Sequence, residues 1–256
     1  MANLSGYRPE SGEQVDWHNQ DQYLSLLTGL PSHLSLFSAK KTPISRLALD
    51  KKFTALTPQH RSLLEDIEGI LQWGYLSPQI KHDLHNSLPI SVIKQVLNTI
   101  SDPALNQLVR DKLDFRTLVG ALRHRYQEPS SPLSGDWTVS RFKQSIENNW
   151  QEPYFRLEHA RPWLIEAKQL MDDDEPLLLE KLLLQVAWQH LSRSHPGLPV
   201  TSGGETFSFY AVVVYVLKWD IIERWSRYNA EQARQRFQQL IDHSISGLPE
   251  DFHGEF

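Results

Sequence analysis

The stretch FYAVVVYVLKWDIIERW, from Phe209 to Trp225, is the least polar run in the chain and constrains its fold most strongly. Such a run can be a buried strand, a membrane span or a helix deep in a core. Its uninterrupted apolar part ends at Leu217, after about half of the ~20 residues that a membrane-spanning helix needs. Lys218 and Asp220 then interrupt it. The composition therefore disfavours a membrane span and leaves the strand and the helix.

The spacing of the apolar residues in this stretch favours the helix. Val212 to Val214 favour a strand locally, because β-branched residues are common in strands. Over the whole stretch, however, large apolar residues recur every three or four positions, which is typical of one face of a helix. These positions are Phe209, Val213, Val216, Leu217, Ile221 and Trp225, and the pattern continues to Tyr228.

Helical pairing also explains the charged residues of the stretch. Asp220 stands four positions before Arg224, and Glu223 stands four positions before Arg227. An acid placed four residues before a base stabilises a helix by about 0.2–0.5 kcal/mol. The pattern predicts one exposed charged stripe, which includes Lys218, on an otherwise buried helix.

Start signals containing proline predict further helices in the first half of the chain. A serine, threonine or aspartate directly before a proline can cap a helix that begins at the proline. The predicted helices run from Thr57-Pro58 to Gly74, from Ser77-Pro78 to Pro89, from Ser91 to Ile100, and from Asp102-Pro103 to a point before Pro129. The shorter apolar run from Tyr23 to Leu30 fits either a helix or a strand.

The second half of the chain is also predicted to be helical. An acidic run precedes Pro176, and acids next to a helix N-terminus interact favourably with the positive end of its dipole. Asn229 is predicted to cap a separate final helix. Besides the stretch described first, the predicted helices are Trp137 to Trp150, the segment after Pro162, the segment after Pro176, and Ala230 to Ile241.

These elements predict an all-α protein with two lobes. The chain shows no alternation of strands with helices and no Asn-Gly or Asp-Gly hairpin turn. The segment QEPSSPLSGD, residues 127–136, is rich in proline, glycine and serine, which is typical of a linker. We expect a polar leader at 1–20, an N-terminal helical lobe at 21–126, this linker, and a C-terminal helical lobe at 137–256.

Composition excludes several classes of function. The chain has no cysteine, so disulfides, thiolate catalysis and cysteine-ligated zinc are excluded. Its net charge of -5 argues against a general nucleic-acid binder, because such proteins usually carry a basic surplus. The first residues, MANLSGYRPESGEQVDWHNQ, show neither a basic start nor an apolar core, so we expect no secretory signal.

Three short motifs could bind a metal ion or a phosphate, but none matches an established pattern. His82 and His85 stand three positions apart, whereas the HExxH zinc motif places its histidines four apart. The acidic run from Asp172 to Glu175 lacks the spaced ligands and the glycine of a calcium loop. Ser202-Gly203-Gly204 matches neither phosphate-binding glycine motif. We therefore expect no catalytic residue, no metal and no cofactor.

The basic and aromatic segment DFRTLVGALRHRY, residues 114–126, is the strongest candidate for a binding surface. Arginine suits interfaces because its planar fork makes two hydrogen bonds at once. Arginine and tryptophan are also the residue types that most often dominate interface energies. The structural alternative is a solvated basic face with partners on its own helix. The predicted protein interface comprises Arg116, Arg123, Arg125, Arg224 and Trp225.

Three segments resemble a bacterial family of uncharacterised proteins. They are LDFRTLVGALRHR, YVLKWDIIERWSRYNAEQARQRFQQLI and, more weakly, YLSLLTGLP. The genes of this family lie among those of V/A-type rotary ATPases. Its members are described as similar to the C subunit of these ATPases. The helix with the YxLKxxIIERW-like pattern, followed by a second helical segment with a spaced phenylalanine, is the most distinctive part of the resemblance.

The resemblance implies a non-enzymatic role in ion transport. The C subunit of such ATPases is an all-helical adaptor that sits on the cytoplasmic face of the membrane rotor ring and accepts the central shaft. The expected partners are other subunits of the rotary ATPase and not nucleic acid. The expected location is the cytoplasm, with peripheral association at the inner membrane face through the complex only. The full C subunit has three similar helical units, whereas this chain is long enough for about two.

Two alternatives to the adaptor remain open from the sequence. The first is a regulatory helical module that binds an anionic partner through Arg116, Arg123 and Arg125. The second is a metal-dependent helical enzyme that uses His82 and His85.

Overall fold

The computed structural model describes residues 22–33, 36–38, 41–71, 89–194 and 208–246. Every regular element in these ranges is a helix, which confirms the predicted all-α fold class. The run from Tyr23 to Leu30, for which the sequence left two structures open, contains a short helix. The α-helices are α1 (Leu24–Thr28), α2 (Arg46–Lys52), α3 (Pro58–Leu71), α4 (Ile90–Thr99), α5 (Pro103–Gln127), α6 (Lys143–Asn148), α7 (Trp163–Asp172), α8 (Pro176–Ser194) and α9 (Phe209–Ser246), and η2 (Leu36–Ser38) and η3 (Phe53–Ala55) are 3₁₀ turns.

Two helices begin at the predicted capping residues. Asp102 Oδ1 accepts hydrogen bonds from the backbone N–H groups of Ala104, at 2.8 Å, and Leu105, at 3.2 Å, and Pro103 is the first residue of α5. Thr57 Oγ1 accepts a hydrogen bond from the His60 N–H at 3.2 Å, where α3 begins. These bonds satisfy N–H groups that have no partner within the helix. The helix predicted from Ser77 lies in residues 72–88, outside the described ranges.

The prediction of one helix from Trp137 to Trp150 is wrong, because only α6 is helical there. The Thr138 Oγ1 accepts a hydrogen bond from the Ser140 N–H, and the Ser140 Oγ accepts one from the Phe142 N–H, both at 3.1 Å. Hydroxyl groups that bind nearby backbone amides compete with helix formation. The segment before α6 therefore forms turns.

The predicted helix break at Asn229 is also wrong, since α9 is continuous from Phe209 to Ser246. An asparagine inside a helix costs less than about 1 kcal/mol relative to alanine. Ending a helix and restarting it would instead leave several backbone groups without intrahelical partners. The chain therefore continues through this position.

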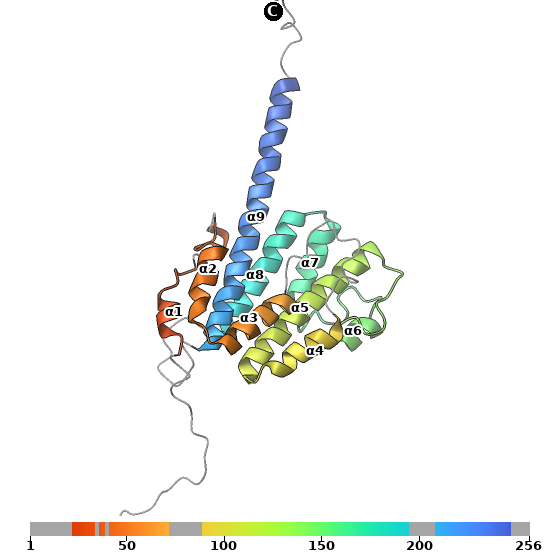
Figure 1. Cartoon of the computed structure of the whole chain (residues 1–256). Helices are drawn as coiled ribbons and strands as arrows, with labels where there is room; N and C mark the ends of the chain where they lie inside the picture. Colours follow the sequence, from red (N-terminus) through yellow and green to blue (C-terminus); the bar gives the residue numbers. More distant parts are fainter. Residues whose placement is uncertain (1–21, 34–35, 39–40, 72–88, 195–207, 247–256) are drawn as a thin grey trace, which may run out of the picture.

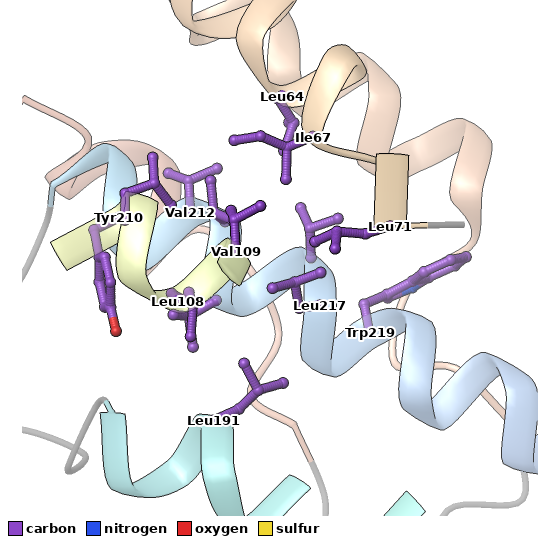
Figure 2. Packing of buried hydrophobic residues seen from close by; sticks show 14 of the residues in the cluster. Leu64, Ile67, Leu71, Leu108, Val109, Leu191, Tyr210, Val212, Leu217 and Trp219 are labelled. Atoms are coloured by element: carbon purple, nitrogen blue, oxygen red, sulfur yellow. The ribbon is translucent and has the colours of Figure 1, made fainter. Parts of the chain in front are cut away.

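The core contains two clusters of buried apolar residues. The larger cluster packs α3, α4, the first half of α5, α8 and α9 together with α1 and α2. Figure 2 shows Val109 of α5 and Leu191 of α8 converging on α9 near Val212 and Leu217, with Ile67 of α3 beside them. The smaller cluster joins the second half of α5 to α6 and α7.

Helix α5 contributes to both clusters and so connects them. Leu113 belongs to the larger cluster and Leu118 to the smaller one. The larger cluster also takes residues from both sides of positions 127–136, because α8 and α9 pack against α3 and α5. The two clusters therefore do not coincide with the expected lobes 21–126 and 137–256. The division of the chain into these lobes stays a prediction.

The first part of α9 is a buried helix, as predicted. In residues 209–225 every apolar side chain except Tyr215 is buried. The predicted exposed stripe of charges on this helix is wrong, however. Lys218 lies over the ring of Trp188 at 5.3 Å from its centroid, and Arg224 pairs with Glu180 instead of Asp220. The predicted pair between Glu223 and Arg227 is confirmed, at 2.5 Å.

The second part of α9 extends away from the other helices. Figure 1 shows the blue end of α9 projecting beyond the bundle that α2, α3, α5, α7 and α8 form. Among the described residues, no helix combines the length and the apolar character needed to cross a membrane.

Candidate functional site

Arg224 and Glu180 form an ion pair where α8 and α9 pack together. The Arg224 Nε donates to one carboxylate oxygen of Glu180, and Nη2 donates to the other at 3.0 Å. The two side chains are 19% and 8% exposed. Bidentate pairing of this kind fixes the geometry of both groups. The pair therefore sets how α9 lies against α8 near the end of its buried part.

Arg123 of α5 interacts with the same acid. Burial lowers the pKa of the Arg123 guanidinium, the carboxylate of Glu180 opposes this shift, and the charge of Arg224 adds to it. One carboxylate thus compensates two basic groups at the junction of three helices. Glu180 therefore offsets part of the cost of removing these two guanidinium groups from water.

Arg125 braces an irregular turn after α6. Its guanidinium donates to the backbone carbonyl of Glu152 and, at 2.6 Å, to that of Pro153, and it lies 4.9 Å from the ring centroid of Phe155. Phe155 and Arg156 have positive φ angles of 56° and 58°, which are uncommon for residues other than glycine. The contacts of Arg125 therefore help to hold a strained turn.

Arg116 contacts the end of α3. Its Nη1 donates to the backbone carbonyl of Ile70 at 3.1 Å. The last carbonyls of a helix have no partner within that helix, so this bond satisfies one of them. Arg116 thereby ties α5 to α3.

Trp225 is 7% exposed and packs inside the chain. Its ring meets Phe37 of η2 edge to face, with 5.0 Å between the centroids. The indole Nε1 is buried and has no hydrogen-bond acceptor among the residues that the structure describes. Trp225 therefore contributes packing between α9 and η2 in this conformation.

The structure brings Arg123, Arg224 and their shared acid together, whereas Arg116 and Arg125 contact other parts of the fold. All five predicted interface residues have contacts within the chain, but with other elements and not on their own helix as the structural alternative expected. Their role in an interface stays a prediction. Sequence reasoning missed Glu180, although an acid within the apolar run LLLEKLLL indicates a buried charge that needs a base.

A second polar network joins α5 to the segment before α6. Asp114 is 3% exposed, and its Oδ1 accepts hydrogen bonds from the Ser140 hydroxyl at 2.6 Å and from the Arg141 N–H at 3.1 Å. The Arg141 guanidinium pairs with Asp114 Oδ2 at 2.6 Å and also with Asp111. These bonds hold the chain that follows the predicted linker against α5.

The structure brings together no group of three or more histidine and acidic residues suited to a metal ion within its described ranges. His82 and His85 lie outside those ranges, as does Ser202-Gly203-Gly204. In the acidic run, Asp172 pairs with Lys168, and the neighbouring acids are exposed.

A scan against protein-family models finds no match for this chain, and searches of curated proteins and of solved structures find none either. The resemblance to the C-subunit-like family thus stays a sequence-based prediction.

Proposed function

We propose that this chain is a non-enzymatic adaptor or accessory subunit of a bacterial V/A-type rotary ATPase, with a role in ion transport. The sequence resemblance indicates the complex, and an all-helical fold agrees with the adaptor that the resemblance implies. Under this proposal the protein works in the cytoplasm and reaches the inner membrane face through its complex.

The observation that carries the proposal is the division of α9 into two parts. Residues 209–225 are core, whereas the part that follows extends beyond the bundle (Figure 1). A helix of n residues is about 1.5n Å long, so residues 229–246 can reach roughly 27 Å from the body. A rigid projection anchored in a core can hold two partners at a fixed distance, which is what an adaptor does.

The half-buried arginines Arg116, Arg123 and Arg224 would act as positioning residues under this proposal. Arg224 and Glu180 join α9 to α8, and Arg123 and Arg116 join α5 to the same assembly. They would fix the direction in which α9 leaves the body. A partner would then contact the extension, and the arginines would act as positioning residues.

The regulatory alternative, in which an anionic partner binds Arg116, Arg123 and Arg125, has less support. Arg116 and Arg125 already donate to backbone carbonyls, and Arg123 is compensated by Glu180. Retention of the purified chain on heparin, lost at modest salt, would favour this alternative.

Co-purification tests the proposed function. The full chain, carrying an affinity tag, is expressed in its native host and recovered from detergent-solubilised membranes. We expect the ATP-hydrolysing subunits of the rotary ATPase in the eluate, in constant ratio to the tagged chain. A variant that ends at Tyr228 keeps the described core and should lose them. Recovery of the tagged chain without these subunits, under conditions that keep the ATPase intact, would refute the proposal.

A further inference from the structure

The side chain of His60 joins the starts of three helices. His60 lies in the first turn of α3, Tyr23 directly precedes α1, and Phe209 is the first residue of α9. Tyr23 is 3% exposed and Phe209 is 8% exposed, so both of these rings are buried, whereas His60 is half-buried.

Hydrogen bonds and two ring contacts hold this junction together. The Tyr23 hydroxyl lies 2.6 Å from His60 Nδ1 and accepts a hydrogen bond from the Thr57 N–H at 3.4 Å. The His60 ring stacks on Phe209, with 4.2 Å between the centroids and 7° between the planes. The Tyr23 ring meets the same imidazole edge to face, at 5.7 Å between the centroids. His60 therefore connects the start of α1 to both α3 and α9.

The Tyr23 hydroxyl proton determines which nitrogen of His60 carries hydrogen. Among the residues that the structure describes, His60 Nδ1 is the only acceptor within hydrogen-bond distance of this hydroxyl. A buried hydroxyl proton without an acceptor is costly, so Tyr23 donates to an unprotonated Nδ1. Nδ1 can accept this bond in the neutral imidazole alone, because both ring nitrogens of the imidazolium carry hydrogen. Protonation of His60 therefore leaves the Tyr23 proton without its acceptor.

The surroundings of His60 also disfavour its charged form. In the first turn of α3, an imidazolium would lie near the positive end of the helix dipole. Burial lowers the pKa of His60 below its ordinary value. The charged neighbours on α3, Arg61 and Glu65, pair with each other at 3.4 Å, and α1 and α9 present the uncharged rings of Tyr23 and Phe209. The face of Phe209 would attract a cation and so offset part of the cost.

We propose that the hydrogen bond between Tyr23 and His60 is a proton-sensitive clasp, which holds α1 against α3 and α9 while His60 is neutral and loosens when His60 is protonated. After the other end of α1, the Pro31 carbonyl accepts a hydrogen bond from the Tyr215 hydroxyl at 2.9 Å. Release of Tyr23 would thus free the first end of α1 while the other stays bound to α9. The clasp would operate whether or not the proposed function is correct.

The direction of the effect follows from proton binding in the folded and unfolded chain. A histidine in the unfolded chain takes up a proton near pH 6.5, whereas the lowered pKa of folded His60 shifts its protonation to more acidic pH. Between these two pKa values the unfolded state binds more protons than the folded state. The clasp therefore contributes its full stability above about pH 6.5 and loses it as pH falls below that value.

Titration of the His60 ring by NMR spectroscopy, in the full chain from pH 4.5 to pH 8, tests the clasp. The His60 signal is identified by its absence from the variant His60→Asn. The His60 pKa should lie below 6.5 in the wild-type chain. Tyr23→Phe keeps the aromatic ring but removes the hydroxyl proton that binds Nδ1, so it should raise the His60 pKa. A wild-type pKa at or above 6.5, or the same pKa in both chains, would overturn the proposal.

Hydrogen exchange of residues 24–30, corrected for intrinsic rates, measures whether α1 is released. In the wild-type chain their protection should be several-fold lower at pH 5 than at pH 7.5, whereas the protection of residues 184–191 in α8 should change less. His60→Asn places an amide that does not titrate beside the Tyr23 hydroxyl. The difference between the two pH values should therefore disappear in this variant.

The matched control is His124→Asn, because His124 also bonds through its ring, to the Ser131 carbonyl at 2.9 Å, and contacts another aromatic ring, that of Trp150. This variant should keep the wild-type difference in the protection of residues 24–30. Equal wild-type protection at both pH values, an equal loss in α8, or a difference that persists in His60→Asn would each contradict the clasp.

Discussion

Replacing Leu217 with aspartate is expected to abolish cooperative folding of the chain. Leu217 is 2% exposed and lies in the larger cluster between α3, α5 and α8 (Figure 2). The substitution removes a packed apolar side chain and places a carboxyl group where no solvent can reach it, at a cost of several kcal/mol. That cost is comparable with the whole stability of a typical domain, about 5–15 kcal/mol.

Urea unfolding followed by circular dichroism measures this effect. Leu178→Asp is the matched control, because Leu178 is 45% exposed on α8 and its replacement should change the free energy of unfolding by less than about 1 kcal/mol. A soluble Leu217→Asp chain with a single sharp transition near the wild-type midpoint would show that α9 is not in the core.

Glu180→Leu is expected to destabilise the chain by about 3–5 kcal/mol, because it removes one partner of a buried ion pair. Leucine is similar in volume to glutamate, so the effect comes mainly from charge. The bidentate bonds to Arg224 are lost, and Arg123 loses the acid that compensates it. Two half-buried guanidinium groups then lose the carboxylate that they share.

Glu223→Leu is the control for this prediction. Glu223 pairs with Arg227, whose side chain is 77% exposed, so the pair is screened by solvent and is worth less than about 1 kcal/mol. Free energies of unfolding from urea titrations at pH 7 give both values. Equal effects of the two substitutions would mean that the Arg224–Glu180 pair is not buried in solution.

The sequence predicted the helices well where local signals were strong. Asp102 followed by Pro103 marks the start of α5, and the three-to-four spacing from Phe209 to Trp225 identifies the buried part of α9. Such signals depend on residues within a few positions of one another. The type of element can therefore be predicted from these signals even when the rest of the fold is not known.

The sequence failed where a distant residue determines the outcome. Arg224 was expected to pair with Asp220 on its own helix, but α8 brings Glu180 to it from 44 positions away. Ser140, which lies inside a predicted helix, instead bonds to Asp114 of α5. Positions on a helical wheel show which side chains share a face, but they do not show which neighbouring helix covers that face.

Photo-crosslinking tests most directly whether α9 connects this chain to a rotary ATPase. A photoreactive phenylalanine analogue replaces Gln238 in the extension or, as a control, Leu47 on α2, which is 69% exposed. Both variants are expressed in the native host and irradiated before solubilisation. We predict a covalent adduct between the Gln238 variant and a subunit of the V/A-type ATPase, and none from Leu47. Adducts only with unrelated proteins or with a second copy of this chain, or the same adducts from both positions, would contradict the account.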